Sequence, residues 1–108
     1  MVWALIFMIE FLQGPLAPHS ESYIMFCIYL IRSSRDKSIY VGYTNDLRRR
    51  LAEHNKNQSV YTRNKGPYEL VYFECYKSIK DAKYRETQLK KHSQAYTQLK
   101  HRIINSLE

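Results

Sequence analysis

Two short strand-like triplets, each with one tyrosine, constrain the fold of this chain more than any other feature. The letters CIY occupy residues 27–29 and the letters YVG occupy residues 40–42, with ten residues between the two tyrosines. Both triplets lie in runs rich in Ile, Tyr and Val, and the intervening SSRDK at residues 33–37 is typical of a turn. The pattern therefore predicts a β-hairpin with strands over residues 24–32 and 38–43.

The position of the turn predicts the register of this hairpin. A turn centred between Ser34 and Arg35 pairs Ile28 with Val41 and Leu30 with Ile39 on one face. On the other face it places Tyr29 directly opposite Tyr40, with Cβ atoms about 5 Å apart. A slip of one residue would break both matches, because it moves every side chain of a strand to the other face.

The rest of the chain continues as helix, strand, helix and helix. A helix follows Asp46, a strand spans Tyr68–Tyr76 after a polar basic loop at residues 55–67, and Ser78 begins a capping sequence for a second helix. The last segment has one apolar helical stripe, formed by Tyr96, Leu99, Ile103 and Leu107. Because no crossover helix separates the first two strands, the predicted class is α+β, with a small antiparallel three-stranded sheet flanked by helices in the order β-β-α-β-α-α.

The first part of the chain, residues 1–22, differs in composition from the remainder. Its apolar opening is interrupted by Glu10, lacks the basic residues of a signal peptide, and is too short to span a bilayer. Three interpretations stay open: an amphipathic arm packed on the domain, a poor export signal, or codons translated ahead of a true start at Met25. We expect an N-terminal extension and linker over residues 1–22 and a single domain over residues 23–108.

Charge is distributed unevenly along the chain. The net charge is +7, and all 17 basic residues but only eight of the ten acidic ones lie in residues 23–108. A basic surface favours a polyanionic partner such as a nucleic acid, although a charge excess kept for solubility is the alternative. The ten tyrosines favour the nucleic acid, because aromatic rings can stack on bases. Cys27 and Cys75 lie in apolar runs and are expected to be buried, reduced thiols of a cytoplasmic protein.

The first helix has polar groups on its apolar side. Arg48 and Arg49 point away from a face that follows the helical spacing, formed by Leu47, Arg50, Leu51 and His54. Arg50 and His54 therefore point toward the sheet. The alternatives are a solvated arginine with its stem along the surface and a histidine that only caps the helix end.

Glu86 is a similar anomaly on the second helix. It lies on an apolar stripe with Ile79, Ala82 and Leu89, whereas the helix's lysines take outer positions. Carboxylates are rarely buried unless they are paired or bind a cation. Glu86 is therefore either a ligand for Mg²⁺ or the partner of a neighbouring arginine.

Taken together, these residues resemble the GIY-YIG nuclease family over about Phe26 to Leu107, and in particular its small single-domain bacterial branch. Members of the family carry a tyrosine in each triplet, an arginine on the next helix, often a histidine or tyrosine one turn later, and a metal-binding glutamate on a later helix. The resemblance implies a single Mg²⁺ or Mn²⁺ ion held by Glu86. It also implies five catalytic residues, namely Tyr29, Tyr40, Arg50, His54 and Glu86.

The chain departs from the family pattern at three positions. Cys27 replaces the first glycine, Val41 replaces an isoleucine, and Tyr43 stands where excision-repair members have a lysine. The letters YTR at residues 61–63, followed by GP at residues 66–67, agree again with the single-domain branch. DNA is the implied partner, with no membrane and no small-molecule cofactor. We expect its backbone to contact Arg48, Arg49, Lys56, Tyr61, Arg63 and Lys65.

The resemblance implies a metal-dependent endonuclease that hydrolyses phosphodiester bonds in DNA, is structure-selective, is linked to repair or recombination, and works in the cytoplasm. Tyr29 or Tyr40 would accept the proton of the attacking water, which requires a depressed phenol pKa. Arg50 would grip the non-bridging oxygens through its planar fork. Two alternatives stay open: a non-catalytic nucleic-acid-binding module with the same fold, and a protein-interaction adaptor that docks through the N-terminal arm.

Overall fold

A computed structural model describes residues 24–56, 64–91 and 93–108 of the chain. Its elements follow the predicted order, with one added 3-10 helix at the end: β1 (Phe26–Ser33), β2 (Ile39–Thr44), α2 (Leu47–Asn55), β3 (Tyr68–Tyr76), α3 (Ile79–Lys90), α4 (Gln94–Arg102) and η2 (Ile104–Leu107). The strands form one antiparallel sheet in the order β2-β1-β3. The predicted α+β class and the three-stranded antiparallel sheet are confirmed.

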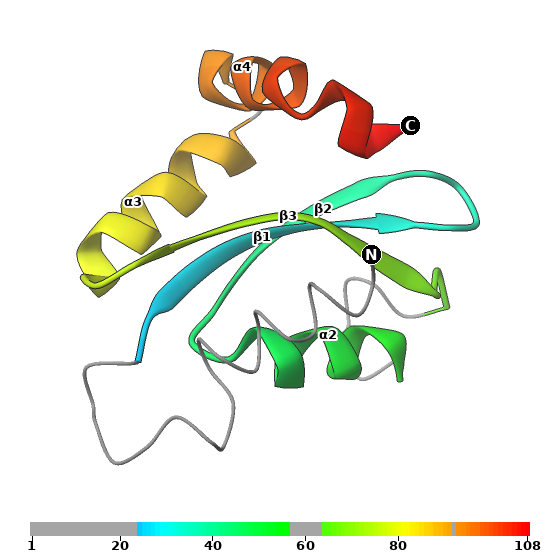
Figure 1. The fold of residues 1–108 in the computed structure, drawn as a ribbon, viewed down its shortest axis with the longest axis horizontal. Coiled ribbons are helices and arrows are strands. Elements are labelled where there is room, and N and C mark those ends of the chain that lie inside the picture. The colour runs from blue at the N-terminus through cyan, green and yellow to red at the C-terminus, as the bar shows by residue number, and fades with distance from the viewer. Residues whose placement is uncertain (1–23, 57–63, 92) are drawn as a thin grey trace.

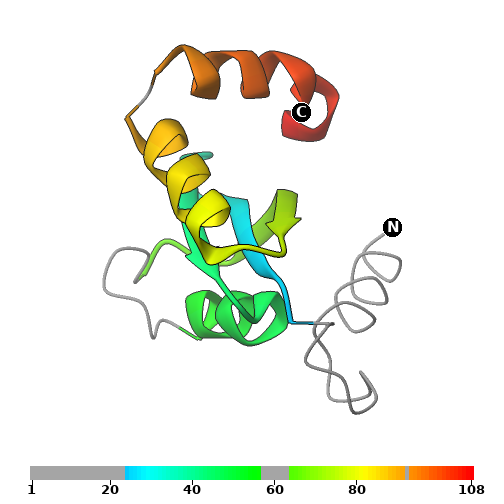
Figure 2. The ribbon, with the colours of Figure 1, turned by 90° about the vertical axis from the view of Figure 1, so that its left-hand side faces the viewer.

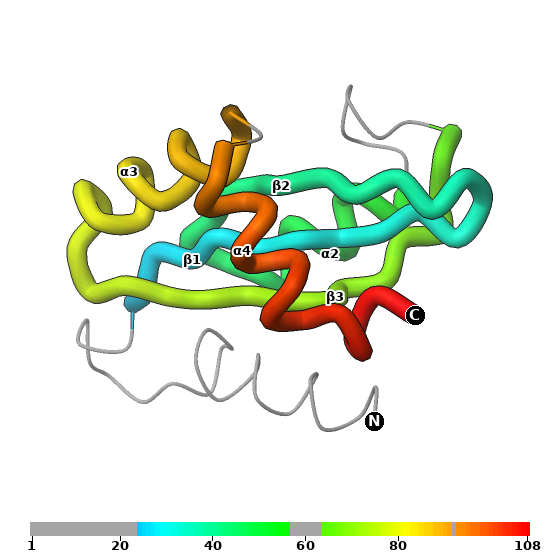
Figure 3. The backbone as a smooth tube through the Cα atoms, turned by 90° about the horizontal axis from the view of Figure 1, so that it is seen from above, coloured from blue at the N-terminus to red at the C-terminus, as the bar shows by residue number. Residues whose placement is uncertain are grey.

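Helices cover both faces of the sheet. In Figures 1 and 2, α2 lies on one side of the strands, and α3 and α4 lie on the other. Seen from above in Figure 3, α4 crosses over the strands. β2 is an edge strand of the sheet, and α3 packs against β2 and its neighbour β1.

The predicted hairpin register is wrong by two residues. The structure pairs Leu30 with Val41 and Tyr29 with Gly42, so the two tyrosines are not directly opposite. The reason is the turn, which is longer than predicted because the Ser33 N–H donates to the Ser38 carbonyl at 2.9 Å. The buried Ser33 hydroxyl also accepts the N–H groups of the next loop residues. Because the shift is an even number of residues, the predicted faces survive.

Each face of the sheet has its own apolar core. The core under α3 and α4 contains Ile28, Leu30, Val41, Ala82, Leu89, Tyr96, Leu99 and Ile103. The core under α2 contains Cys27, Tyr29, Ile31, Leu47, Tyr68 and Leu70. The predicted stripe on the last segment is confirmed at its first three positions, which are buried. Ile79, predicted to share a stripe with Glu86, is instead 46% exposed, because it begins α3 at the end of the sheet.

The expectation of two reduced thiols is also wrong. Cys27 and Cys75 stand directly opposite each other on β1 and β3, with Cα atoms 4.0 Å apart, and their sulfur atoms form a disulfide. The sequence shows that both residues lie in strands. It does not show that the β1–β3 register makes them cross-strand neighbours.

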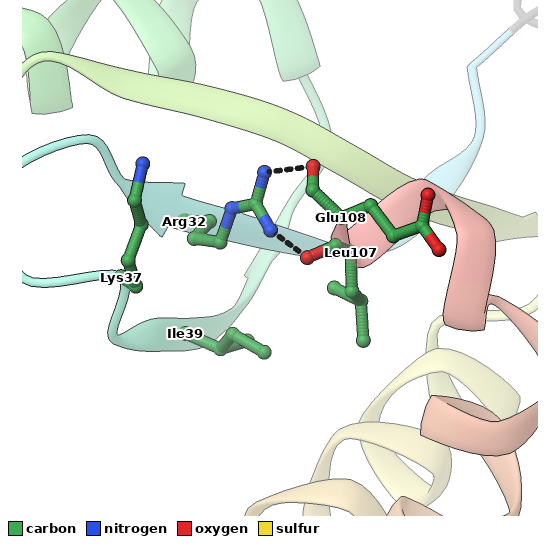
Figure 4. A pocket seen from close by; sticks show the side chains of 5 residues that line it. All are labelled: Arg32, Lys37, Ile39, Leu107 and Glu108. Carbon is green, nitrogen blue, oxygen red and sulfur yellow. Dashed lines mark hydrogen bonds between the residues drawn. The ribbon is translucent and has the colours of Figure 1, made fainter.

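Arg32 anchors the last residues of the chain to the end of β1. Its guanidinium donates to the carbonyl oxygens of Leu107 and Glu108, as Figure 4 shows. It also lies 3.6 Å from the Glu69 carboxylate on β3. These contacts hold η2 over the C-terminal end of β1. Arg32 is thereby assigned to packing and not to the site described below.

Two expectations lie outside what the structure tests. The first is the predicted division at residue 22, because residues 1–22 lie outside the described residues. The second is the predicted DNA contact of Tyr61 and Arg63, which also lie outside them. Across the described ranges, every helix falls short of the length and apolar character needed to cross a bilayer.

Candidate active site

Tyr29 reaches the edge of the sheet by crossing over Gly42. The two residues are opposite each other on β1 and β2, and the Tyr29 ring lies across the glycine. A Cβ added to Gly42 would lie 2.7 Å from Tyr29 Cε2 and would overlap Cζ and Oη. Glycine is therefore required here for space and not for backbone conformation. The crossing carries the phenol of a nearly fully buried tyrosine toward β2.

The helix face predicted for α2 is confirmed. Asp46 caps the helix by accepting the Arg49 N–H at 3.1 Å. Leu47 and His54 are buried against the sheet, whereas the Arg50 side chain is 28% exposed. Arg48 and Arg49 lie on the solvent side, as predicted. The orientation is thus established, while the catalytic roles stay predictions.

His54 is a fully buried imidazole surrounded by tyrosines. Its Nε2 lies 2.8 Å from the Tyr29 hydroxyl oxygen, within hydrogen-bond distance. Its ring centroid lies 5.3 Å from that of Tyr40 and 6.0 Å from that of Tyr68. Burial, assisted by the nearby Arg50 guanidinium, lowers the pKa of His54 from 6.5 to about 4. The imidazole is therefore neutral at pH 7 and available as a proton acceptor.

The pKa of the Tyr29 phenol is raised, whereas a simple general base would require a lowered pKa. Burial raises its pKa to about 12, the Arg50 guanidinium opposes this rise, and Tyr40 and Glu86 add to it. The requirement for a depressed phenol pKa, stated from the sequence, is therefore not met at Tyr29. A protonated Tyr29 can still relay a proton, because its hydrogen-bond partner His54 is neutral.

Glu53 holds the Arg50 guanidinium, and the sequence interpretation overlooked it. Arg50 Nη1 donates to Glu53 Oε1 at 2.8 Å, and Arg49 Nη1 donates to the other carboxylate oxygen at 3.3 Å. The hydrogen bond from Arg50 lowers the pKa of Glu53. An acid three residues after an arginine is a visible helical pair, so the spacing alone could have indicated this contact.

Glu86 lies on α3 with most of its side chain covered. The side chain is 15% exposed, and its carboxylate pairs with Lys90 at 2.9 Å and Lys83 at 3.6 Å. The salt-bridge alternative raised from the sequence is thus present, although the partners are lysines and not an arginine. The lysines predicted to occupy outer positions turn back onto the carboxylate because they are three and four residues from it.

The five predicted catalytic residues converge from several elements on the β2 edge. Tyr29, Arg50 and His54 come together through the Tyr29–His54 contact and through the influence of Arg50 on the pKa of both groups. Glu86 is close enough to raise the pKa of Tyr29. Tyr40 joins α2 to α3, because its ring faces His54 and lies 6.0 Å from Lys90 Nζ.

Glu86 supplies the one carboxylate among these five residues. Among the described residues, no group of three His, Cys, Asp or Glu side chains gathers to hold an ion. A single hard carboxylate suits Mg²⁺ or Mn²⁺, which bind one carboxylate together with water and substrate phosphate oxygens. The donor set therefore fits an ion that binds with a phosphate and does not fit a closed all-protein metal site.

The predicted nucleic-acid contacts fall in two places. Arg48 and Arg49 are exposed on α2, and Lys56 is exposed directly after the last residue of this helix. Lys65 is exposed near the β1–β2 turn, where its carbonyl accepts the Ser33 hydroxyl at 2.6 Å. These positions leave basic side chains on the α2 side of the molecule.

Asn55 positions the end of α2, and it was also missed. Its Oδ1 accepts the Tyr68 N–H at 2.7 Å, and its Nδ2 donates back to the Tyr68 carbonyl at 3.4 Å. This pair joins the last residue of α2 to the first residue of β3. It therefore fixes His54 beside Tyr68. No local pattern indicated it, because Asn55 looks like an ordinary loop residue in the sequence.

Fold and site together define a small α+β domain with a tyrosine–histidine pair, an arginine and a carboxylate on one sheet edge. The family model for the GIY-YIG catalytic domain matches residues 25–100. The chain therefore belongs to the GIY-YIG family, and this membership implies a nuclease-type function.

The chain is also similar to individual proteins from other organisms. The chain is 40% identical over 67 residues to a UPF0213 protein of Haloquadratum walsbyi, which covers 61% of this chain and 74% of that protein. It is 40% identical over 65 residues to a UPF0213 protein of Clostridium perfringens, with coverage of 59% and 69%. A solution NMR structure of a UPF0213 protein from Bacillus halodurans is 30% identical, covers 70% of this chain and 81% of that one, and has a TM-score of 0.45.

Proposed function

We propose that this protein is a metal-dependent endonuclease that hydrolyses phosphodiester bonds in DNA. The observation that carries the proposal is the Tyr29–His54 pair, a protonated phenol hydrogen-bonded to a buried neutral imidazole at 2.8 Å. Hydrolysis of a phosphodiester requires an activated water, stabilised charge on the phosphoryl oxygens, and help for the leaving oxygen. The site offers a chemical group for each of these needs.

The Tyr29–His54 pair handles the proton. With Nδ1 carrying the proton of the neutral ring, His54 Nε2 accepts the Tyr29 hydroxyl hydrogen. As Tyr29 Oη takes a proton from the attacking water, its own proton passes to His54. The phenol therefore need not be ionised beforehand. An approaching phosphate raises the pKa of His54, because a nearby negative charge favours the imidazolium.

Arg50 and Glu86 handle the charge on the phosphate. Arg50 is half-buried, and its planar guanidinium suits two phosphate oxygens. Glu53 sets the direction of this guanidinium through its hydrogen bond. Glu86 would hold a single Mg²⁺ or Mn²⁺ ion, which when bound supplies a Lewis acid for the charge on the leaving oxygen.

We further propose that the substrate is recognised by DNA backbone shape. The exposed basic residues on α2 and near the hairpin suit contacts to phosphate oxygens, and such contacts carry no sequence information directly. This favours selection of a branched or nicked structure, which is consistent with work in repair or recombination in the cytoplasm. The catalytic unit in this proposal is residues 23–108, which includes the matched residues 25–100.

A second candidate is a non-catalytic nucleic-acid-binding module of the same fold. The observation that favours it is the pairing of Glu86 with two lysines, which already satisfies the carboxylate without a metal ion. In that case the basic surface would bind DNA and the site residues would serve only packing.

An incision assay separates the two candidates. Purified protein is incubated with linear, nicked, flap and four-way-junction DNAs in Mg²⁺, in Mn²⁺ and in EDTA, beside Glu86→Gln. We expect metal-dependent cleavage of at least one branched DNA, and we expect Glu86→Gln to lose cleavage while keeping DNA binding. Undiminished cleavage by Glu86→Gln would remove Glu86 from the mechanism. Binding without cleavage of any DNA by the wild-type protein would establish the binding module.

A further inference from the structure

Two lysines of α3 hold the Glu86 carboxylate from opposite sides along the helix. Lys83 Nζ lies 3.6 Å from Oε1, and Lys90 Nζ lies 2.9 Å from Oε2. The lysine side chains are 54% and 47% exposed, whereas the Glu86 side chain is only 15% exposed. A largely covered carboxylate is thus shielded by two long cationic side chains whose outer parts are open to solvent.

Both lysines also face tyrosines of β2. Lys83 Nζ lies 3.9 Å from the centroid of the Tyr43 ring, which is a close cation–π distance. Lys90 Nζ lies 6.0 Å from the centroid of the Tyr40 ring. The two ammonium groups therefore stand at the β2 edge, toward which Tyr29 crosses over Gly42. Glu86, which both lysines pair with, is close enough to Tyr29 to raise the pKa of its phenol, so a phosphate bound between Tyr29 and Glu86 would come near the lysines.

The pairing has a consequence for any divalent cation. Lys83 and Lys90 already neutralise the single carboxylate available to the ion, and like charges close together repel. A cation that enters the free protein must displace both ammonium groups from Glu86. It gains no cluster of acidic ligands in return, because the described residues contain no such cluster. A DNA phosphate changes this balance, because its oxygens accept the ammonium groups and also offer oxygen ligands to the ion.

We propose that Lys83 and Lys90 form a lysine clamp, which covers Glu86 in the free protein and moves to substrate phosphate oxygens when DNA binds, so that the divalent cation loads with DNA or after it. The proposal rests on the proposed nuclease function and adds two phosphate-binding residues and an order of binding to the site. Ordinary helix-surface ion pairs are the contrasting explanation. Such pairs would make no direct contact with DNA phosphates.

The first test measures Mn²⁺ binding to the free protein by electron paramagnetic resonance of the unbound ion. The variant is the double substitution Lys83→Gln/Lys90→Gln. Its matched control is Lys80→Gln/Lys91→Gln, which removes the same charge from exposed lysines of the same helix region. We expect the clamp variant to bind Mn²⁺ roughly three- to tenfold more tightly than the control, in line with two exposed ion pairs. Equal Mn²⁺ affinity for the two double variants would overturn the proposal.

The second test measures affinity for a branched DNA in EDTA, where no cleavage takes place. Both double variants lose two positive charges, so both should bind more weakly and show a smaller salt dependence. The clamp variant should lose several-fold more affinity than the control, because its lysines contact phosphate directly. An equal loss in both variants would show that the lysines do not reach the DNA, and this outcome also overturns the proposal.

These measurements keep the clamp separate from the nuclease activity. Glu86→Gln should abolish the tighter Mn²⁺ binding of the clamp variant, which shows that the ion competes at this carboxylate. If the wild-type protein cleaves no DNA while both binding results appear as expected, the nuclease proposal fails and only the binding roles of Lys83 and Lys90 stand. If the wild-type protein cleaves DNA with metal but both double variants behave alike, the clamp fails and the nuclease proposal stands.

Discussion

The Tyr29 ring lies across Gly42, and this crossing places the phenol beside His54 on the α2 side of the sheet. The two tyrosine-bearing triplets therefore meet through Tyr29 and Gly42, and not through a direct pairing of Tyr29 with Tyr40. It makes the glycine of the second triplet part of the site, although glycine has no side chain to contribute.

Gly42→Ala should displace Tyr29. The added methyl overlaps the phenol ring, so the ring or the strand must move, at a cost of about 1–3 kcal/mol of stability. Gly66→Ala is the control, because a Cβ there meets no atom closer than 3.8 Å. Chemical denaturation of both variants, followed by an incision assay, checks the expectation. Wild-type stability and cleavage for Gly42→Ala would contradict the crossing.

Tyr29→Phe should lower turnover more than Tyr40→Phe. Loss of the Tyr29 hydroxyl removes the proton relay to His54, which is worth about 10²–10⁴-fold in rate. It also costs about 1 kcal/mol of stability, because His54 loses a buried hydrogen bond. Single-turnover cleavage rates, with the protein in saturating excess over the DNA, provide the measurement. Full rate in both variants would assign the tyrosines to sheet packing, and a larger loss for Tyr40→Phe would make Tyr40 the proton acceptor.

Arg50→Lys should be nearly as damaging to turnover as Arg50→Ala. A lysine keeps the charge but cannot make the two parallel hydrogen bonds of a guanidinium to phosphate. Arg49→Ala is the comparison, because Arg49 pairs with the same Glu53 but lies on the exposed side of α2. Arg49→Ala should weaken DNA binding and leave turnover at saturation close to wild type. Equal losses of turnover in the two alanine variants would refute the assignment of the helix faces.

Glu53→Gln should act on the site through Arg50. The substitution keeps the side-chain length but replaces a charged acceptor of the Arg50 guanidinium with a neutral one. We expect turnover to fall several-fold with little change in DNA affinity, because the guanidinium loses its direction and not its charge. Cleavage rates and binding isotherms on the same DNA separate the two effects. A fall in affinity alone would make Glu53 a part of the general surface charge.

The stability of the fold should decrease between pH 6.5 and pH 4. Burial lowers the folded-state pKa of His54 to about 4 from 6.5, so the unfolded chain binds more protons in this window. The contribution is fully present above pH 6.5 and is lost as pH falls toward 4, by up to about 3 kcal/mol. Denaturation at pH 7, 5.5 and 4.5 should show this slope in wild type and in His101→Gln, and a flatter slope in His54→Gln.

A direct titration provides a second check on His54. The ring resonances of His54 in the wild-type NMR spectrum should stay at their neutral positions from pH 7.5 down to about pH 5. A midpoint near the ordinary histidine value would contradict the buried neutral imidazole, whatever the stability of His54→Gln.

Much of this protein follows from local pattern. Alternation and turn residues predict the hairpin, the apolar stripes predict the helix faces, and the capping residues Asp46 and Ser78 mark two helix starts that the structure confirms. The set of tyrosines, arginine, histidine and glutamate likewise stands in the sequence at recognisable spacings. These features need only neighbouring residues, because helix and strand periodicities are properties of a few consecutive positions.

Only the tertiary structure decided which residues contact one another. A buried serine lengthened the turn and moved Tyr29 from Tyr40 to Gly42, and the β1–β3 register brought Cys27 to Cys75. The pKa values of Tyr29 and His54 moved in directions set by burial and by the Arg50 charge from another element. Register, burial and electrostatic environment depend on segments far apart along the chain. For that reason the sequence by itself supplied candidate catalytic residues, whereas the fold decided their partners and protonation states and added Gly42, Glu53 and Asn55 to their surroundings.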